Sequence, residues 1–216
     1  MSSKSVFQLH FLGHAAFDLR MGDMRFCLDP HKPGALGGRF HFPEIQGPFD
    51  AIVHTHAHED HSAWTPALGT TRIVDGDCDV GSVQLRVRPA FHDAHGGKRM
   101  GLVRMVSLQS GALRVVHCGD IAAWNDRDVG WLKHTDVLLV PVGGTYTLNG
   151  DRAAELVRAV QPRVCVPMHA ADRLVDLPLD PIADFMDKMN WPTAACEKLE
   201  SPLPQTQTVC VMLRPE

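Results

Sequence analysis

The sequence predicts two β-sheets packed against each other, with helices on the outside. Short apolar segments, several of alternating pattern, dominate the first half of the chain, whereas the second half alternates strands with helical stretches. Two packed sheets with outer helices accommodate both patterns. The chain has 216 residues, of which 44% are hydrophobic and 21% charged, so we expect a single domain over residues 1–216.

The strands of the first half are short and are separated by turn-forming residues. We expect a Gly/Pro-rich loop at 31–50, and Asp-Gly, Gly-Gly and Ser-Gly pairs between later strands indicate turns. The expected strands are 6–12, 15–20, 24–29, 51–55, 71–75, 83–89, 100–108 and 113–119.

The second half begins with its most apolar strand, 136–142, and continues with a predicted helix over 150–161. The apolar stripe of that helix consists of Ala153, Leu156, Val157 and Val160. The remaining predictions are a strand at 163–169, a helix at 179–191 with Pro181 in its first turn, and a final strand at 207–215.

The charge balance argues against nucleic acid or membranes as partners. The formal net charge is −4 and the pI is about 6.3, so no global basic field attracts polyanions. No apolar stretch approaches the roughly 20 residues that span a bilayer. The N-terminal residues lack a signal-peptide pattern, and the six cysteines are scattered without a CxxC pair. We therefore expect a cytoplasmic protein with reduced thiols.

The segment HTHAHEDH carries the most informative residues. His56, His58, Asp60 and His61 directly follow a predicted strand. Side chains two residues apart in an extended segment point to the same side, so His56 and His58 can bind one ion together, and the following turn can direct Asp60 and His61 at a second. A solvated polar loop would explain one or two of these histidines but not their spacing.

Three further candidate ligands follow apolar strands later in the chain: His92, Asp120 and His169. Ligands from several strand ends can meet at one sheet edge, where rigid strands fix their geometry. The resulting five histidines and two aspartates would fill two adjacent metal sites. His95 competes with His92, which we favour because it directly follows its strand.

HTHAHEDH, AFH, CGD and PMH, in this order, resemble the motifs of metallo-β-lactamase-fold metallohydrolases. GHAAF and PVGGTYTL are most similar to the ascorbate-6-phosphate lactonase-like branch. This resemblance implies an α+β fold, an αββα sandwich with metals at one edge. It also implies that His56, His58 and His92 hold one divalent ion, that Asp60, His61 and His169 hold another, and that Asp120 bridges them.

The resemblance implies a hydrolase in which a water or hydroxide between the two ions attacks a small ester, lactone or phosphodiester. The metal is expected to be zinc, with manganese or iron as alternatives. Asp60 or Asp120 could also move a proton. Asp29 corresponds to an early strand-end aspartate of this group of proteins, and we expect it to orient a ligand histidine.

Two alternative functions stay open. One is an iron-dependent redox enzyme of the thiol or persulfide oxygenase type. His58 stands where the oxygen-reducing diiron branch usually has glutamate, which argues against that branch. The other is a nucleic-acid-processing phosphodiesterase, which the acidic balance disfavours. We expect a small-molecule substrate and make no prediction of the oligomeric state.

Several other residues have two interpretations, as pocket residues or as structural ones. His14 could line the site or be structural, and the sequence favours neither. Packing is the default for His54, His117, Trp64 and Trp124, and solvation for His31 and His41. Thr145 and Tyr146 lie beyond a strand end and could meet a polar substrate. Ala170 stands where close relatives often have a tyrosine, which leaves the substrate-facing wall open.

Overall fold

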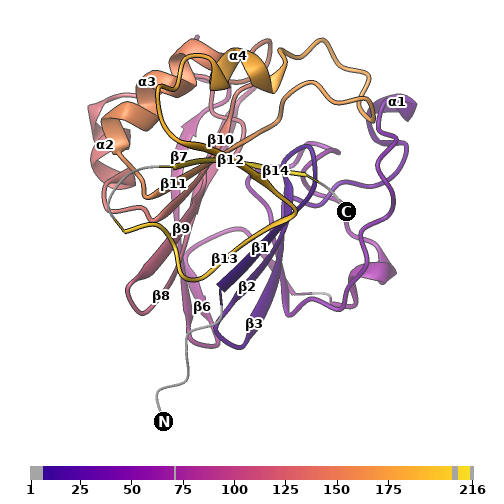
Figure 1. Cartoon of the computed structure of the whole chain (residues 1–216). Helices are drawn as coiled ribbons and strands as arrows, with labels where there is room; N and C mark the ends of the chain where they lie inside the picture. Colours follow the sequence, from indigo (N-terminus) through magenta and orange to yellow (C-terminus); the bar gives the residue numbers. More distant parts are fainter. Residues whose placement is uncertain (1–6, 71, 206–208, 215–216) are drawn as a thin grey trace.

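Two β-sheets pack face to face in the computed structural model, which describes residues 7–70, 72–205 and 209–214 (Figure 1). One sheet has six strands in the order β13-β1-β2-β3-β4-β5, and the other has eight in the order β12-β14-β11-β10-β9-β8-β7-β6. The predicted sandwich is confirmed. The parts of the predicted strands at Val6, Thr71, 207–208 and Pro215, and the N-terminal residues 1–5, lie outside the described residues.

The six-stranded sheet is built mainly from the N-terminal quarter of the chain, and its first three strands form an antiparallel meander. Its strands are β1 (Phe7–Gly13), β2 (Ala16–Met21), β3 (Met24–Leu28), β4 (Ala51–Val53), β5 (Ile73–Val74) and β13 (Lys198–Glu200).

The eight-stranded sheet is antiparallel at one side, from β6 to β9, and parallel from β9 through β10, β11, β14 and β12. Its strands are β6 (Cys78–Val80), β7 (Val83–Phe91), β8 (Leu102–Ser110), β9 (Leu113–His117), β10 (Val137–Pro141), β11 (Val164–Met168), β12 (Thr193–Cys196) and β14 (Val209–Leu213).

The main core lies between the sheets. Phe17, Leu19 and Phe26 from the first sheet are completely buried against Leu108 and Leu139 from the second. Full burial of one such side chain contributes about 1.5–3 kcal/mol. Because alternate residues of each strand face this layer, the period-two pattern of β1 and β2 fixes which face turns inward.

The two outer faces of the sandwich are covered differently. Three helices pack on the outer face of the eight-stranded sheet (Figure 1): α2 (Asp126–Leu132), α3 (Gly150–Val160) and α4 (Ile182–Met186). On the six-stranded sheet, Cys27 and Ile52 instead pack against the loop residues Ile45 and Phe49 and against Leu68 of η1 (Pro66–Leu68). The single turn α1 (Ala35–Gly38) lies within the Gly/Pro-rich loop.

The expected strands and both expected helices are present in the described residues, with shorter bounds for β4, β5, β9 and α4. The sequence does not predict the short strands β6, β12 and β13 or the single turns α1 and η1. It also does not predict α2, whose sequence DRDVGWL lacks an apolar stripe. Instead, α2 begins with a capping box: Asn125 accepts the backbone N–H of Asp128, and the Asp128 side chain accepts that of Asn125.

Strand direction brings the candidate ligands to one edge of the sandwich. β7 and β9 both run antiparallel to β8, and β10 and β11 run parallel to β9, so all four end at the same edge. β3 and β4 are likewise parallel to each other. Residues that directly follow these strands can therefore meet, as the sequence predicts.

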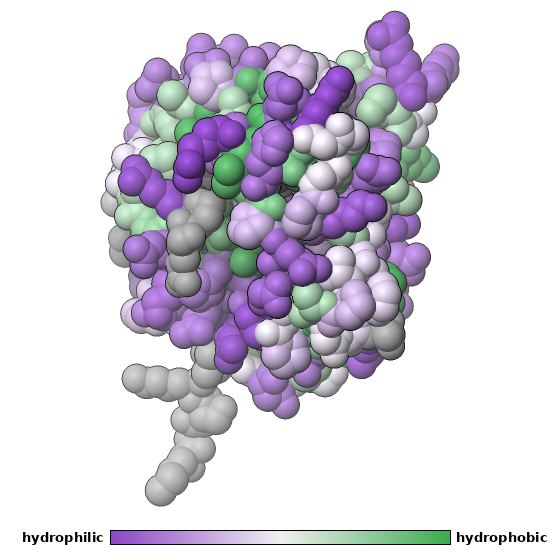
Figure 2. Space-filling view, turned by 90° about the vertical axis from the view of Figure 1, so that its right-hand side faces the viewer, coloured by the Kyte–Doolittle hydropathy of each residue, from purple (hydrophilic) through white to green (hydrophobic). Residues whose placement is uncertain are grey.

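The face in Figure 2 carries mostly hydrophilic side chains with smaller hydrophobic areas between them. The six cysteines are free, and four of them are buried. No helix among the described residues has the length and apolar character needed to cross a bilayer.

Candidate metal centre

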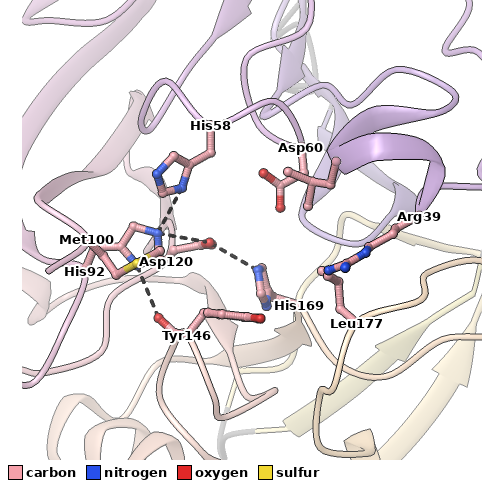
Figure 3. Close-up of a pocket in the computed structure, with 10 residues that line it drawn as sticks. Arg39, His58, Asp60, His92, Met100, Asp120, Tyr146, His169 and Leu177 are labelled. Atoms are coloured by element: carbon pink, nitrogen blue, oxygen red, sulfur yellow. Dashed lines mark hydrogen bonds and ion pairs between the residues drawn. The ribbon is translucent and has the colours of Figure 1, made fainter.

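The seven predicted ligands come together at one edge of the sandwich, where they surround the carboxylate of Asp120. In Figure 3, His58 and His92 lie on one side of this carboxylate, and Asp60 and His169 lie on the other. All seven are buried except His58, which is partly exposed to the cavity. The sequence-predicted convergence is therefore observed in the structure.

Three histidines form the first set. Nδ1 of His58 lies 2.9 Å from Nε2 of His56 and 3.2 Å from Nε2 of His92. Zinc–nitrogen bonds of about 2.1 Å in tetrahedral geometry place ligand atoms about 3.4 Å apart. The three nitrogens therefore have nearly the spacing that one shared ion requires.

The second set contains Asp60, His61 and His169. Oδ2 of Asp60 lies 3.4 Å from Nε2 of His61, and ligand atoms of all three residues lie within 4.8 Å of one another. The rings of His61 and His169 are nearly parallel, at 11°, with centroids 5.6 Å apart.

Asp120 stands between the two sets. Its Oδ2 is 3.1 Å from Nε2 of both His61 and His169, 3.8 Å from Nε2 of His56 and 3.7 Å from Nε2 of His92. The residue before Asp120 must be small for the chain to take this path. A Cβ at Gly119 would lie 2.6 Å from a methyl carbon of Val103. One carboxylate is thus placed to contact ions on both sides.

The site concentrates buried negative charge. Asp29, Asp60 and Asp120 are buried, and in the described part of the chain their ionic partners are histidines rather than Lys or Arg. Although burial opposes ionisation, His169 and His61 hold the pKa of Asp120 well below its usual range. Such carboxylates need a compensating cation.

The imidazoles respond to this field in two ways. Burial and the nearby His61 lower the pKa of His56 to about 3, so it stays neutral, as a metal ligand must. For His61, burial opposes the charged form, but Asp120 and Asp60 raise its pKa well above the usual value. The carboxylates of Asp120 and Asp60 thus favour positive charge at His61, and a metal ion bound there would supply such a charge.

Several buried polar atoms at this edge have no hydrogen-bond partner: Nε2 of His61, Oδ1 of Asp120 and Nδ1 of His169. Unsatisfied buried polar atoms are costly, and native proteins rarely leave them so. Divalent ions bonded to the three residues of each set and to Asp120 would compensate this buried donor set, so these residues fit the ions that the sequence predicts.

Hydrogen bonds on the far side of the rings orient the ligands. Nδ1 of His61 donates to Oδ2 of Asp29 at 2.9 Å, and Nδ1 of His56 donates at 3.0 Å to the Thr55 hydroxyl, which donates to Asp29 at 2.6 Å. Nδ1 of His92 donates to the carbonyl oxygen of Tyr146 at 3.2 Å. Each bond leaves Nε2 directed at the site. Asp29 therefore has the orienting position expected of it.

The structure places His92, and not its competitor His95, beside His58. His95 is exposed, and its backbone N–H donates to Oδ1 of Asp93. Both oxygens of Asp93 accept backbone N–H groups from the loop that follows, at 2.7–3.0 Å. This carboxylate shapes the loop that carries Met100 to the pocket.

A cavity of about 480 Å³ opens onto the centre. Four of its lining residues are not predicted from the sequence: Leu36, Arg39, Met100 and Leu177. Figure 3 shows the Arg39 guanidinium extending toward His169. The Gly/Pro-rich loop at 31–50 thus contributes Leu36 and Arg39 to the cavity.

Only one of the aromatic and hydroxyl candidates reaches the cavity. Tyr146 lines it, whereas the Thr145 hydroxyl donates to the carbonyl oxygen of Pro178. Trp64 is 47% exposed and donates to the carbonyl oxygen of Thr70. Trp124 packs against the helical layer, where the Arg152 guanidinium lies over its ring.

The remaining histidines and Ala170 lie outside the cavity lining. His31 is buried against Phe40 and Phe42, and His41 is exposed. His117 is satisfied: its Nε2 donates to the Ala15 carbonyl oxygen, and its Nδ1 accepts the Gly119 N–H. His54 is buried outside the donor sets, and Ala170 packs on the helical layer.

Comparison with known proteins identifies the family of this chain. Residues 8–169 match the family described as beta-lactamase superfamily domain. A UPF0173 metal-dependent hydrolase from Thermococcus onnurineus is 27% identical over 190 residues, covering 75% of this chain and 84% of the relative.

Two solved structures illustrate the range of similar folds. A metallo-β-lactamase superfamily protein from Thermotoga maritima aligns with a TM-score of 0.75 at 24% identity, over 96% of this chain and 98% of that one. The diiron β-hydroxylase CmlA from Streptomyces venezuelae aligns with a TM-score of 0.54 at 18% identity, over 78% of this chain and 45% of that one. Because the family match spans most of the polypeptide and the sandwich carries the donor set at its edge, the chain belongs to the beta-lactamase superfamily and has the metallo-β-lactamase fold.

Proposed function

We propose that the protein is a dinuclear metal-dependent hydrolase that acts on a small ester, lactone or phosphodiester. The relatives named metal-dependent hydrolases support the general class. The two-ion arrangement and the substrate classes are our own proposal, as is the cytoplasmic location. The ascorbate-6-phosphate lactonase-like placement stays a prediction.

The position of Asp120 is the observation on which the proposal depends. Its carboxylate lies within 3.1–3.8 Å of nitrogens from both histidine sets. We assign His56, His58 and His92 to one ion, Asp60, His61 and His169 to the other, and Asp120 to both. A single ion would leave one of these buried sets without a partner.

Two ions held there would lower the pKa of a water molecule and stabilise negative charge on the attacked centre. Asp60 and Asp120 serve this chemistry as ligands, because the neighbouring histidines hold the pKa of each carboxyl well below its usual range despite burial. A proton-donating role for either carboxyl is correspondingly less favoured.

The cavity supports a small substrate with a polar, anionic part. Its volume of about 480 Å³ is within the usual range for small-molecule sites. Leu36, Met100 and Leu177 offer apolar contacts, whereas Arg39 offers a cation. The net charge of the chain, −4, does not favour a nucleic acid as the substrate.

Metal identity is also part of the proposal. Five histidines and two carboxylates suit zinc first, and manganese or iron as alternatives. The similarity to the diiron hydroxylase CmlA, at 18% identity, concerns the fold alone. An iron redox enzyme is therefore a distinct outcome of the test rather than an equal proposal.

The test combines elemental analysis with a panel of aryl esters, lactones and aryl phosphodiesters. We expect two ions per chain and hydrolysis of at least one substrate class, with both abolished or strongly reduced in Asp120→Ala and His58→Ala. His95→Ala is the matched control, since this histidine is three residues from His92 in the chain but is exposed and outside the donor sets, and activity should persist. Metal-loaded protein that is inert to the whole panel, or persistent iron with oxygen uptake, would refute the hydrolase proposal.

A further inference from the structure

His14 lies in the turn between β1 and β2, at the same edge of the sandwich as the candidate ligands. Its backbone is in the left-handed region, with φ of 56°, which non-glycine residues rarely adopt. Its side chain is completely shielded from solvent. Asparagine, aspartate and histidine tolerate this conformation better than most residues, and strained backbone often occurs at functional sites.

The surroundings of His14 are those of the second ligand set. Its Nε2 lies 3.3 Å from Oδ2 of Asp60, and its ring centroid lies 3.9 Å from that of His169 and 5.5 Å from that of His61. Ligand atoms of these four residues all lie within 4.8 Å of one another. Figure 3 shows Asp60 and His169 facing each other across the space beside Asp120.

Both ring nitrogens of His14 lack a hydrogen-bond partner. This distinguishes it from two neighbouring buried groups that fulfil structural roles. His117 uses both ring nitrogens in hydrogen bonds to backbone groups. Asp29 accepts hydrogen bonds from Thr55 and His61, so its oxygens are already occupied. Among the described residues outside the seven candidate ligands, His14 alone brings an unpartnered buried nitrogen to the set that contains Asp60.

We propose that His14 is an additional ligand of the second ion, which makes the two metal sites unequal. This inference rests on the dinuclear centre proposed above. The first site would have four protein donors: His56, His58, His92 and Asp120. The second would have five: His14, Asp60, His61, His169 and Asp120.

Donor number determines which ions each site prefers. Four donors in a closed set suit tetrahedral zinc. Five donors that include two carboxylates, with room for solvent, suit ions of five- or six-fold coordination such as Fe²⁺, Mn²⁺ or Co²⁺. The second site should therefore bind an ion with five or six ligands and not one with four in tetrahedral geometry.

The test is a Co²⁺ titration of the apo-protein, followed by visible absorption and by calorimetry. Four-coordinate Co²⁺ absorbs strongly in the visible range, and five- or six-coordinate Co²⁺ absorbs weakly. We expect one strongly and one weakly absorbing equivalent in the wild-type protein. Two strongly absorbing equivalents would overturn the inference without any variant.

Two substitutions separate a ligand from a hydrogen-bond donor. His14→Asn tolerates the left-handed backbone and removes the imidazole, and His14→Gln supplies an N–H that can still donate to Asp60. As a ligand, His14 should be irreplaceable, so both variants should lose second-site affinity by about tenfold or more. Recovery of affinity in His14→Gln would show that His14 only positions Asp60 and would refute the proposal.

His31→Asn is the matched control, because His31 is also buried with unpartnered ring nitrogens but lies outside the donor sets. It should bind both ions as the wild-type protein does. Wild-type protein that binds fewer than two ions would refute the dinuclear function together with this inference. Two ions bound with unchanged affinity and spectrum in His14→Asn would refute the inference alone.

Discussion

The backbone N–H of His169 donates a hydrogen bond of 2.8 Å to the carbonyl oxygen of His14. This bond joins the end of β11, in the eight-stranded sheet, to the β1–β2 turn of the six-stranded sheet. Both residues have left-handed backbone, with φ of 53° and 56°. A backbone hydrogen bond thus connects the two sheets at the edge that carries the candidate ligands. The packing of the sandwich and the spacing of these ligands therefore depend on each other.

Gly143 offers a direct test of that dependence. A Cβ at this position would lie 2.0 Å from the carbonyl oxygen of His169, so Gly143→Ala must displace the His169 backbone. We expect a loss of about 1–3 kcal/mol in the free energy of unfolding, as for overpacked cores, together with weaker metal binding. Urea denaturation and metal titration measure the two effects.

The control for this substitution is Gly76→Ala. Neither glycine has a left-handed φ, and an added Cβ at Gly76 meets no atom within 4 Å. Gly76→Ala should therefore leave stability nearly unchanged and metal binding intact. Equal effects of the two substitutions would contradict the role assigned to the close approach at His169.

Asp29 should control metal affinity without touching a metal. It accepts hydrogen bonds from His61 and from the backbone and hydroxyl of Thr55. Asp29→Asn replaces one accepting oxygen by a donor, so at least one of these bonds is lost. Because such orienting partners typically contribute 10–100-fold, we expect metal affinity to fall by about that factor. Chelator competition with a metal-sensitive dye measures it.

Asp18→Asn serves as the comparison for Asp29→Asn. Asp18 also lies on the six-stranded sheet, but its carboxylate pairs with Arg25 at 2.8 Å, outside the donor sets. Its loss can lower stability slightly but should not change metal affinity. A similar loss of metal affinity in both variants would indicate general destabilisation instead of ligand orientation.

The apo-protein should lose stability as the pH falls below about 6.5. Burial lowers the pKa of six histidines in the folded state, so the unfolded chain takes up protons that the folded chain does not. Stability is then greatest above the unfolded value of about 6.5 and falls as the pH drops toward the folded values. These histidines are His14 and His56, at about 3, His31, at about 4, and His54, His92 and His117.

His61 contributes with the opposite sign, because Asp120 and Asp60 raise its pKa despite burial, but it is one residue against six. Urea midpoints of the apo-protein should therefore fall steadily between pH 7 and pH 4.5. His31→Gln should flatten this dependence, whereas His41→Gln, at an exposed residue, should not. A midpoint that stays constant over this range would refute the prediction.

The sequence predicts the convergence of the seven candidate ligands because they lie in segments that follow apolar strands, and strand direction sends such segments to one edge. It cannot assign His14 in the same way, since that residue joins the site only when the two sheets pack. Arg39 reaches the cavity through the path of an irregular loop, which no periodicity describes. β12 and β13 are short and pair with distant strands, so their local sequence carries little signal.

Arg39 should select substrates that carry a negative charge. Its guanidinium lines the cavity, and among the described residues it makes no ion pair with an acidic side chain. Arg39→Ala should raise KM for an anionic ester by about tenfold, corresponding to about 1.4 kcal/mol of uniform binding, and should leave kcat nearly unchanged. KM for a neutral ester of the same shape should not change. Arg39→Lys should restore part of the affinity, because lysine keeps the charge but not the forked geometry.

Arg127→Ala, at the start of α2 and away from the cavity, is the control. Equal effects on charged and neutral esters would show that Arg39 shapes the cavity without recognising charge.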